Sequence, residues 1–533
     1  MNMEFRYTHL VFFFLLPIFM NASDVQEEIR KRLEHSASLN IRANGELVHC
    51  KKMITKFYQN CVFEPQWTSE YNISELVQAL KNSHKEGLTP EDYHLTAIQK
   101  MLSPYKTLSL AEKADLDILS SDAFLLYASH LLSGKLDPLS IDPEWKVSRR
   151  EGDPLLMLHN ALEKKEVLKT LQGAIPQNEK YDGLKKALAQ FVNLRQNNGW
   201  EKIPEGETLK LNMSDDRIES IRKRLIQGGY LKNKNPENAL KYDQEVLNAV
   251  RDFQKRNGIN ADGEFGKETR ELFNMSVEQR IDQIKANMER WRWLPQYFGD
   301  YFIKVNIADF TLTVVKNGKV EREHKVIVGR EQRRTPVFAS KVSYLVLNPT
   351  WTVPPGILKA DILPAVRKNP NYLKGKNISV LDANGKVMDQ SAIDWHSKGV
   401  HGFTYRQSPG VDNALGAVKF MFPNPYNVYL HDTPSKELFE RADRAFSSGC
   451  VRVEAPLDLA EYLLQDQSKW TRAYIDKQVA SKRTETVPLT QKPDVYILYW
   501  TTWLDDHGQV QFRKDVYQRD LALIEKLKEG PPK

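Results

Sequence analysis

The stretch Ser447-Ser448-Gly449-Cys450-Val451-Arg452 decides the fold and chemistry expected of this chain, and His431 stands nineteen positions before its cysteine. His431 ends the apolar run Val428-Tyr429-Leu430, which predicts a strand. A thiol attacks acyl groups as the thiolate, so it needs an imidazole or another positive group close by. Gly449 lets a carbonyl group approach the backbone, where main-chain N–H groups can stabilise an oxyanion. The stretch therefore predicts a cysteine nucleophile, a histidine base and an oxyanion site.

A single cysteine in a long chain is more often a small buried hydrophobe than a nucleophile, so its surroundings decide between the two. Cys450 follows a serine pair and a glycine and stands two positions before an arginine, which is a polar setting for a core residue. The segment 435–446 has a helical pattern that would return the chain to the strand carrying His431. These features make Cys450 a candidate catalytic residue.

The run S-x-G-C-x-R, preceded by a strand that ends in His431-Asp432-Thr433, resembles the signature of the L,D-transpeptidases, the YkuD-type cysteine enzymes of bacterial cell walls. Val328-Gly329-Arg330, followed by Thr335-Pro336, is similar to the glycine and Thr-Pro turn that opens the same domain. The resemblance covers about residues 301–452. Shorter members of the family usually have a glycine after the base histidine and a second histidine two residues before the cysteine, where this chain has Asp432 and Ser448. The role of that second histidine is not carried over.

The resemblance implies catalytic roles for Cys450 as nucleophile and His431 as base, with Ser447 and Gly449 in the same turn. Ser447 is a candidate hydrogen-bond partner of His431 or of the oxyanion region. Arg452 can bind a substrate carboxylate through two hydrogen bonds, although a structural pairing inside the turn explains it nearly as well.

Further candidate substrate-binding residues come from the strand of His431 and from a long insertion. Tyr429 stands two residues before His431, so it is expected on the same side of the strand, where it would orient the base or line the cleft. Asn348-x-x-Trp351 and Arg406-Gln407-x-x-Gly410 resemble the longer, capped members of the family. Trp351, Arg406 and the adjoining Tyr405 are expected to contact substrate.

The reaction implied by the resemblance is acyl transfer on peptidoglycan stem peptides. The Cys450 thiolate would attack the amide between the L-centre of diaminopimelate and the terminal D-alanine of a donor tetrapeptide, and an amine of an acceptor stem would resolve the thioester. The product would be a diaminopimelate–diaminopimelate cross-link. β-Lactams, carbapenems in particular, are candidate inhibitors of such a thiol.

Other functions stay open on the sequence. With water as acceptor, the same residues would make an L,D-carboxypeptidase or an enzyme that attaches proteins to the wall or releases them. A non-catalytic wall-binding scaffold with an inert Cys450 is a different class. A papain-like protease is disfavoured because the base precedes the nucleophile and the context is rich in strands.

Length and composition indicate an exported protein of several domains. The chain has 533 residues, of which 41% are apolar, and its net charge of +7 comes without a dense Lys/Arg block that would indicate nucleic-acid binding. Arg6, the apolar residues 10–20 and Ala22-Ser23 predict a secretory signal peptide over residues 1–23, or an uncleaved N-terminal anchor. Both alternatives predict export to the periplasm or cell envelope, with membrane attachment only through an uncleaved leader.

The expected fold class is multidomain α+β. Residues 24–207 are expected to form a helical scaffold, with long helices over 110–132 and 181–194, and residues 208–275 a three-helix unit. In that unit the run FQ-x-x-x-G-x-x-x-DG resembles the peptidoglycan-binding domain of wall enzymes. A linker helix over 276–298, opened by a capping box of Ser276 and Gln279, is expected to pack on the scaffold.

Residues 299–533 are expected to form a mostly-β catalytic domain of the YkuD type. Strands are predicted over 301–306, 312–315, 325–328 and 343–347, with an Asn317-Gly318 hairpin turn. An insertion over about 351–412 is too long for a simple connection, which predicts a cap over the substrate.

No cofactor and no metal site is expected. His396 and His401 are five positions apart and lack partner cysteines or an H-E-x-x-H pattern. Cys50 and Cys61 either form a disulfide in an oxidising compartment or remain reduced core residues.

Overall fold

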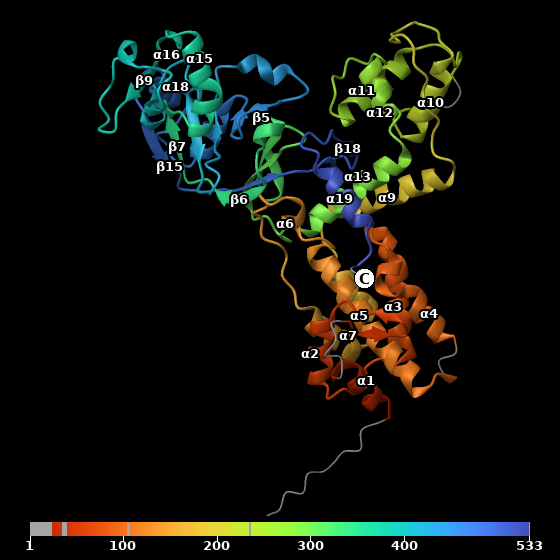
Figure 1. The fold of residues 1–533 in the computed structure, drawn as a ribbon. Helices are drawn as coiled ribbons and strands as arrows, with labels where there is room; N and C mark the ends of the chain where they lie inside the picture. The colour runs from red at the N-terminus through yellow and green to blue at the C-terminus, as the bar shows by residue number, and fades with distance from the viewer. Residues whose placement is uncertain (1–23, 35–39, 104–106, 234–235, 532–533) are drawn as a thin grey trace, which may run out of the picture.

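The computed structural model describes residues 24–34, 40–103, 107–233 and 236–531, so the expected leader over residues 1–23 lies outside the described residues. Within these ranges the chain forms an N-terminal helical body, a small helical body and a β-rich body, which meet around α9 (Glu179–Gln196) and α13 (Val277–Arg292) (Figure 1). The fold is therefore multidomain α+β, as the sequence predicts. None of the described helices has the length and apolar content needed to cross a bilayer.

The N-terminal body is built around α5 (Leu110–Ser133), which a Ser109–Glu112 capping box opens. Its middle is buried almost all round because the surrounding helices cover every face. These helices are α1 (Asp24–Glu34), α2 (Lys51–Asn60), α3 (Glu70–Asn82), α4 (Leu95–Leu102), α7 (Pro154–Lys164) and α8 (Val167–Ala174). Cys50 and Cys61 are free and flank the two ends of α2, about 16 Å apart at a helical rise of about 1.5 Å per residue, which is too far for a disulfide.

The small helical body consists of α10 (Arg217–Gln227), α11 (Gln244–Arg256) and α12 (Lys267–Phe273), which enclose a core of their own. Gln254 of α11 is 1% exposed and holds the following loop. Its amide donates to Asp262 Oδ1 and to the Glu264 carbonyl, both at 2.9 Å, and accepts from the Gly263 N–H at 2.7 Å. The FQ…DG run is thus the structural clamp of this domain.

Helices α9 and α13 share one hydrophobic core with the β-rich body. The apolar stripe of α13 lies in that core, where Trp291 stacks on Trp500 at 4.9 Å between ring centroids. α13 also contacts α9 and α5, and Ser276 and Gln279 form the expected capping box at its start. α13 therefore joins the helical and β-rich bodies and does not act as a detached linker.

Buried polar groups fix this joint. Arg292 of α13 is fully buried and pairs with Glu289 at 2.6 Å. Arg292 also donates to the Glu86 carbonyl and to the Tyr181 hydroxyl of α9, and that hydroxyl donates to the Glu86 carboxylate, each at 2.9 Å. Breaking one partner of such a pair leaves a buried charge uncompensated, which typically costs about 3–5 kcal/mol.

The β-rich body contains a sheet with the strand order β15-β7-β11-β12-β14-β5-β4-β3-β16-β6, and β13 also pairs with β5. The four predicted strands correspond to β3, β4, β5 and β7, whereas β6 was not predicted. The Asn317-Gly318 turn connects β4 to β5 with both residues left-handed. The strands are β3 (Tyr301–Asn306), β4 (Thr311–Lys316), β5 (Lys319–Gly329), β6 (Phe338–Lys341), β7 (Tyr344–Leu347), β11 (Val418–Met421), β12 (Leu430–His431), β13 (Ala445–Ser447), β14 (Val451–Val453), β15 (Glu485–Pro488) and β16 (Asp494–Leu498). His431 thus lies on an inner strand.

The C-terminal segments cover the sheet and return to α13. Their bounds are α17 (Pro456–Leu464), α18 (Arg472–Ala480), β17 (Thr502–Leu504), β18 (Val510–Phe512) and α19 (Arg519–Lys528). α19 packs on α13, and Asp520 at its start pairs with the buried Arg290 at 2.5 Å. The end of the described chain thus lies beside the helical joint (Figure 1).

The insertion between β7 and β11 has its own core and its own sheet, in the order β8-β10-β9. Its elements are β8 (Trp351–Thr352), α14 (Pro355–Ile357), a π-helical turn (Leu358–Ile362), α15 (Leu363–Lys368), α16 (Tyr372–Gly375), β9 (Ile378–Leu381) and β10 (Thr404–Gln407). It stands at the end of the β-rich body away from the N-terminal helices (Figure 1). We call residues 351–412 the cap.

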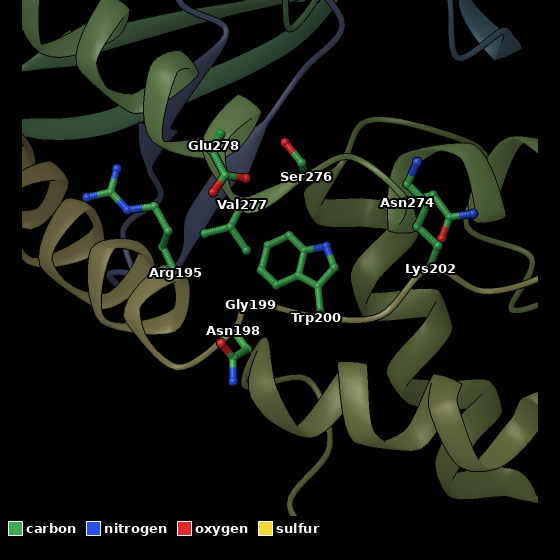
Figure 2. A pocket seen from close by; sticks show the side chains of 9 residues that line it. All are labelled: Arg195, Asn198, Gly199, Trp200, Lys202, Asn274, Ser276, Val277 and Glu278. Carbon is green, nitrogen blue, oxygen red and sulfur yellow. The ribbon is translucent and has the colours of Figure 1, made fainter.

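A cavity of about 220 Å³ lies at another junction, where α9, the segment leading to the small helical body and the start of α13 meet (Figure 2). Trp200 lies between Arg195 and Asn274 in this view. The Trp200 indole donates to the Met275 carbonyl at 2.9 Å, and the Arg224 guanidinium lies 3.3 Å from its ring centroid. The cavity is therefore part of the joint that holds the small helical body.

Candidate active site

The Cys450 turn connects two strands that both pair with β5. β13 runs parallel to β5 and β14 runs antiparallel to it, so the chain reverses within Ser448-Gly449-Cys450. Gly449 has φ +116°, a conformation that side chains strongly disfavour. The expected helix over 435–446 is wrong: the structure has a single 3₁₀ turn over Lys436–Glu440 and then β13, because pairing with β5 overrides the local helical pattern.

Hydrogen bonds from inside and outside the turn hold its shape. Ser447 is 2% exposed; its hydroxyl donates to the Cys450 carbonyl at 2.5 Å and accepts from the Gly449 N–H at 3.1 Å. Thr335 donates to the Gly449 carbonyl at 2.8 Å and accepts from the Gly329 N–H at 2.9 Å. Ser447 therefore braces the turn, whereas the sequence suggested a bond to His431 or to the oxyanion. The Gly and Thr-Pro motif supports the same turn from outside.

Strand pairing places Cys450, Tyr429, His431 and Arg452 on one face. β12 and β14 are parallel, with Leu430 opposite Val451 and His431 opposite Arg452, which sets Tyr429 opposite Cys450. Alternate residues of a strand share a face, so Leu430 and Val451 enter the core while the other four side chains face the opposite side. The Tyr429 and His431 rings lie 5.6 Å apart between centroids. The thiol and the imidazole therefore lie on the same side of the fold.

Asp432 fixes the tautomer of His431. The His431 Nδ1 lies 2.5 Å from the Asp432 carbonyl, which can only accept, so Nδ1 carries the proton and Nε2 keeps a lone pair. The Asp432 carboxylate accepts from the backbone N–H groups of Ala417 and Thr433 at 2.8 and 2.7 Å and pairs with Lys436. The aspartate that replaces the usual glycine thus anchors the base.

Burial keeps both reacting groups neutral. It lowers the pKa of His431 to about 3, and the nearby Arg452 charge acts in the same direction. It also raises the pKa of the Cys450 thiol, although the backbone and hydroxyl groups of Tyr429 and the charge of Arg452 oppose it. The resting pair is therefore a thiol and a neutral imidazole. This corrects the expectation that His431 lowers the pKa of the thiol.

No hydrogen bond links Cys450 to His431 in the described part of the chain, and Sγ lies 3.7 Å from the Asn427 carbonyl. Catalytic hydrogen bonds are often loose without substrate and tighten when it binds. Among the turn amides, the Gly449 N–H is occupied by Ser447. The Cys450 N–H beside the sulfur is the amide placed to stabilise an oxyanion.

Two cations flank the base on this face. Arg452 stands opposite His431 on one side, and Lys419 of β11 stands opposite it on the other. The Arg452 Nε is buried and has no protein hydrogen-bond partner among the described residues. The Lys419 ammonium lies 5.7 Å from the Tyr429 ring centroid. The face therefore suits a substrate with carboxylates, and Lys419 had no signal in the sequence because only strand pairing brings it here.

One arginine connects the cap to the nucleophile turn. Arg333 donates to the Asp361 carboxylate of the cap at 2.6 Å and to the Ser448 hydroxyl at 2.8 Å. Arg330 also lies 3.7 Å from Asp361. Asp361 sits on the π-helical turn of the cap, so the position of this turn is coupled to the residues beside Cys450.

The structure places the cap residues chosen from the sequence differently. Tyr405 is 1% exposed, and its hydroxyl donates to the Val400 carbonyl at 2.9 Å, so it supports the cap core and does not line a cleft. Trp351 is half-buried against that core, and Arg406 is exposed on β10. Within the described ranges, no hydrogen bond or ion pair joins these three residues to Cys450 or His431.

Three family models match the chain. Residues 300–482 match the L,D-transpeptidase catalytic domain of the YkuD family, residues 214–272 a "Putative peptidoglycan binding domain", and residues 52–188 a scaffold domain. The chain carries a YkuD-type L,D-transpeptidase catalytic domain. The L,D-transpeptidase domain contains the Cys450 turn, His431 and the cap.

A curated relative agrees with this assignment. A protein of Haemophilus influenzae named "Putative L,D-transpeptidase" is 39% identical over 250 residues, which is 46% of this chain and 50% of that protein. The chain thus spans half the length of this relative.

Solved structures of L,D-transpeptidases also match. One from Stackebrandtia nassauensis is 15% identical and covers 56% of this chain and 96% of its own, with a TM-score of 0.21. L,D-transpeptidase 1 of Mycobacterium tuberculosis is 14% identical and covers 37% and 61%, with a TM-score of 0.16. The residue geometry above comes from this chain alone.

The neutral resting pair predicts how Cys450 of the L,D-transpeptidase domain reacts with iodoacetamide. Since its pKa is raised above 9.0, the alkylation rate should still be rising at pH 9. Peptide mass spectrometry resolves Cys450 from Cys50 and Cys61. A rate plateau between about pH 4 and pH 8, typical of a thiolate–imidazolium pair, would contradict the electrostatics described here.

Proposed function

We propose that this protein is a peptidoglycan L,D-transpeptidase that forms diaminopimelate–diaminopimelate cross-links through a thioester on Cys450. The observation that carries the proposal is the shared sheet face of Cys450 and His431, with His431 Nδ1 committed to the Asp432 carbonyl and Nε2 free to accept a proton. The peptidoglycan-binding domain over residues 214–272 supports a substrate in the cell wall. Because that substrate lies in the cell wall, the protein would be exported through its leader and would act in the cell envelope.

The acylation half of the reaction uses a neutral base. As the Cys450 sulfur attacks the donor carbonyl, its proton passes to His431 Nε2 and a C–S bond forms. The Cys450 N–H stabilises the oxyanion. The C–N bond then breaks, His431 returns the proton to the leaving amine, and D-alanine departs.

The deacylation half reverses the roles of the leaving and attacking groups. The side-chain amine of an acceptor stem attacks the thioester carbonyl and His431 removes its proton. The C–S bond breaks and Cys450 recovers its proton from His431. The buried Nε of Arg452 has no hydrogen-bond partner in the described ranges, so this side chain is placed to bind a stem carboxylate. Tyr429 lies opposite Cys450 on the neighbouring strand, and its ring contacts the His431 ring on the same face of the sheet.

Defined muropeptides test this proposal. The protein is mixed with a tetrapeptide donor and a tripeptide acceptor, and intact mass is followed together with the soluble products. A covalent adduct on Cys450, release of D-alanine and a dimeric product would support the transpeptidase. Free tripeptide without dimer would assign the L,D-carboxypeptidase, and no adduct at all would favour the wall-binding scaffold. A β-lactam, as a strained amide, is expected to acylate the same thiol.

The thioester has to meet an amine before water, which requires a site that excludes solvent. We assign this role to the cap, because Arg333 couples Asp361 of the cap to Ser448 beside the nucleophile. Both side chains of the Arg333–Asp361 pair are partly exposed, so its contribution is expected to be modest.

Asp361→Asn is expected to raise hydrolysis relative to cross-linking. Losing a partly exposed ion pair of ~0.4–1 kcal/mol would favour cap opening by about two- to fivefold. The measurement is the ratio of free tripeptide to dimer at fixed acceptor concentration. Asp412→Asn changes an exposed carboxylate elsewhere in the cap and is the matched control. An unchanged ratio in Asp361→Asn would mean that the cap does not decide whether water or an amine accepts the acyl group.

A further inference from the structure

The N-terminal body gathers metal-binding side chains far from the Cys450 turn. Glu46 and His49 follow the left-handed Asn44-Gly45 turn, which connects β1 (Arg42–Ala43) to β2 (Glu46–Leu47). His94 stands at the start of α4, and Asp122 lies in the middle of α5. Ligand atoms of His49, His94 and Asp122 all lie within 4.8 Å of one another. Three separate elements thus bring the cluster together, which explains why residues 46–122 showed no metal motif in the sequence.

The Asp122 carboxylate makes hydrogen bonds that fix the positions of both histidines. Its side chain is fully buried and accepts from the backbone N–H groups of His49 at 2.8 Å and Cys50 at 2.7 Å. It also lies 2.8 Å from His94 Nε2. A carboxylate so placed draws the His94 proton onto Nε2 and leaves a lone pair on Nδ1. This is the arrangement by which an outer carboxylate orients a metal-binding histidine.

His94 is buried, and the ring edge that points away from Asp122 faces a second carboxylate. His94 Nδ1 lies 3.6 Å from Glu46 Oε2, which is too long for a hydrogen bond. Two ligands at about 2.0–2.2 Å from a tetrahedral Zn²⁺ lie about 3.3–3.6 Å apart. The His49 ring lies parallel to the His94 ring, with 5.3 Å between centroids and 7° between planes, so the two imidazoles are neighbours. His94 also holds φ +58°, a strained conformation for a non-glycine residue.

We propose that Glu46, His49 and His94 bind one divalent transition-metal ion of the Zn²⁺ class, with Asp122 as the outer carboxylate that orients His94. Imidazole and carboxylate donors suit this class of ion, and three protein ligands leave a fourth position open. The Glu46 side chain is 51% exposed, so an ion can reach the site from solvent. The competing explanation is a doubly protonated His94 that bridges Asp122 and Glu46 without metal.

Metal titration of the full chain tests the proposal. The protein is prepared without a polyhistidine tag, stripped with a chelator and titrated with Zn²⁺ by calorimetry, and Co²⁺ is added separately to record its visible absorption. One ion per chain is expected, with a Co²⁺ spectrum of low coordination number. Glu46→Gln and His49→Gln should each weaken binding by about tenfold or more.

Controls separate a built site from surface binding. His396→Gln changes an exposed histidine in the cap and should leave affinity and stoichiometry unchanged. Glu46→Gln alters only a half-exposed side chain, so its circular dichroism should match the unmodified chain even if His49→Gln disturbs the fold. Binding that persists in both Glu46→Gln and His49→Gln would mean an adventitious ion only. Absence of bound Zn²⁺ in the unmodified chain would favour the bridging imidazolium, and either result overturns the proposal.

Discussion

Cys450→Ala should abolish cross-linking and remove the covalent adduct with donor peptide and with β-lactams, while the fold is retained. The sulfur forms the bond that carries the acyl group, so its loss is expected to lower the rate by at least about 10³-fold. The Cys450 side chain keeps part of its surface exposed, and its Sγ lies 3.7 Å from the Asn427 carbonyl. The expected change in stability is therefore small. Product analysis and intact mass measure the first effect, and circular dichroism and thermal unfolding measure the second.

Cys61→Ala is the matched control for this variant. It removes a half-buried sulfur that contacts the Phe57 carbonyl at the end of α2, remote from the β-rich body. Its activity and adduct yield should equal those of the unmodified chain. If Cys450→Ala kept activity with normal stability, the scaffold function would be favoured and the thioester mechanism rejected.

The elements defined by local pattern were predictable from the sequence. β3 follows the alternation over 301–306 residue for residue, and the Asn317-Gly318 turn sets the hairpin that follows. α5 and α9 agree with their predicted cores within a few residues because their apolar periodicity is long. Local pattern failed over 435–446, where the partner strand β5 decides the conformation.

Only the signature residues of the active site could be predicted from the sequence. Cys450 and His431 stand close in the sequence and carry a recognisable motif, whereas Lys419 and Arg333 reach the site through pairing and contacts that no local pattern encodes. Burial also changed the electrostatics, because the sequence cannot say how much water surrounds a group. The cap shows the same limit: Tyr405 was predicted to contact substrate because it adjoins a family-like motif, yet its side chain lies in the cap core.

His431→Asn is the second change with a large expected effect, because it removes the base and keeps its anchor. The asparagine amide N–H can replace His431 Nδ1–H as donor to the Asp432 carbonyl, while nothing replaces Nε2. Cross-linking at neutral pH should fall by about 10²–10⁴-fold. The residual activity should rise with pH as the thiolate fraction of Cys450 increases, since no base is then needed for attack. Alkylation of Cys450 at high pH should persist.

Acid stability gives a readout of His431 that is independent of activity. Its pKa is near 3 in the folded chain and 6.5 in the reference state, so the unfolded chain binds the proton first and stability is lost as pH falls through 6.5 towards 3. At pH 5 this loss amounts to about 2 kcal/mol, and His431→Asn should be spared it. Chemical unfolding at about pH 7 and pH 5 measures the difference, with His396→Asn in the exposed cap as control. Equal acid sensitivity of His431→Asn and the unmodified chain would mean that His431 is solvated, and the neutral-base mechanism would lose its physical basis.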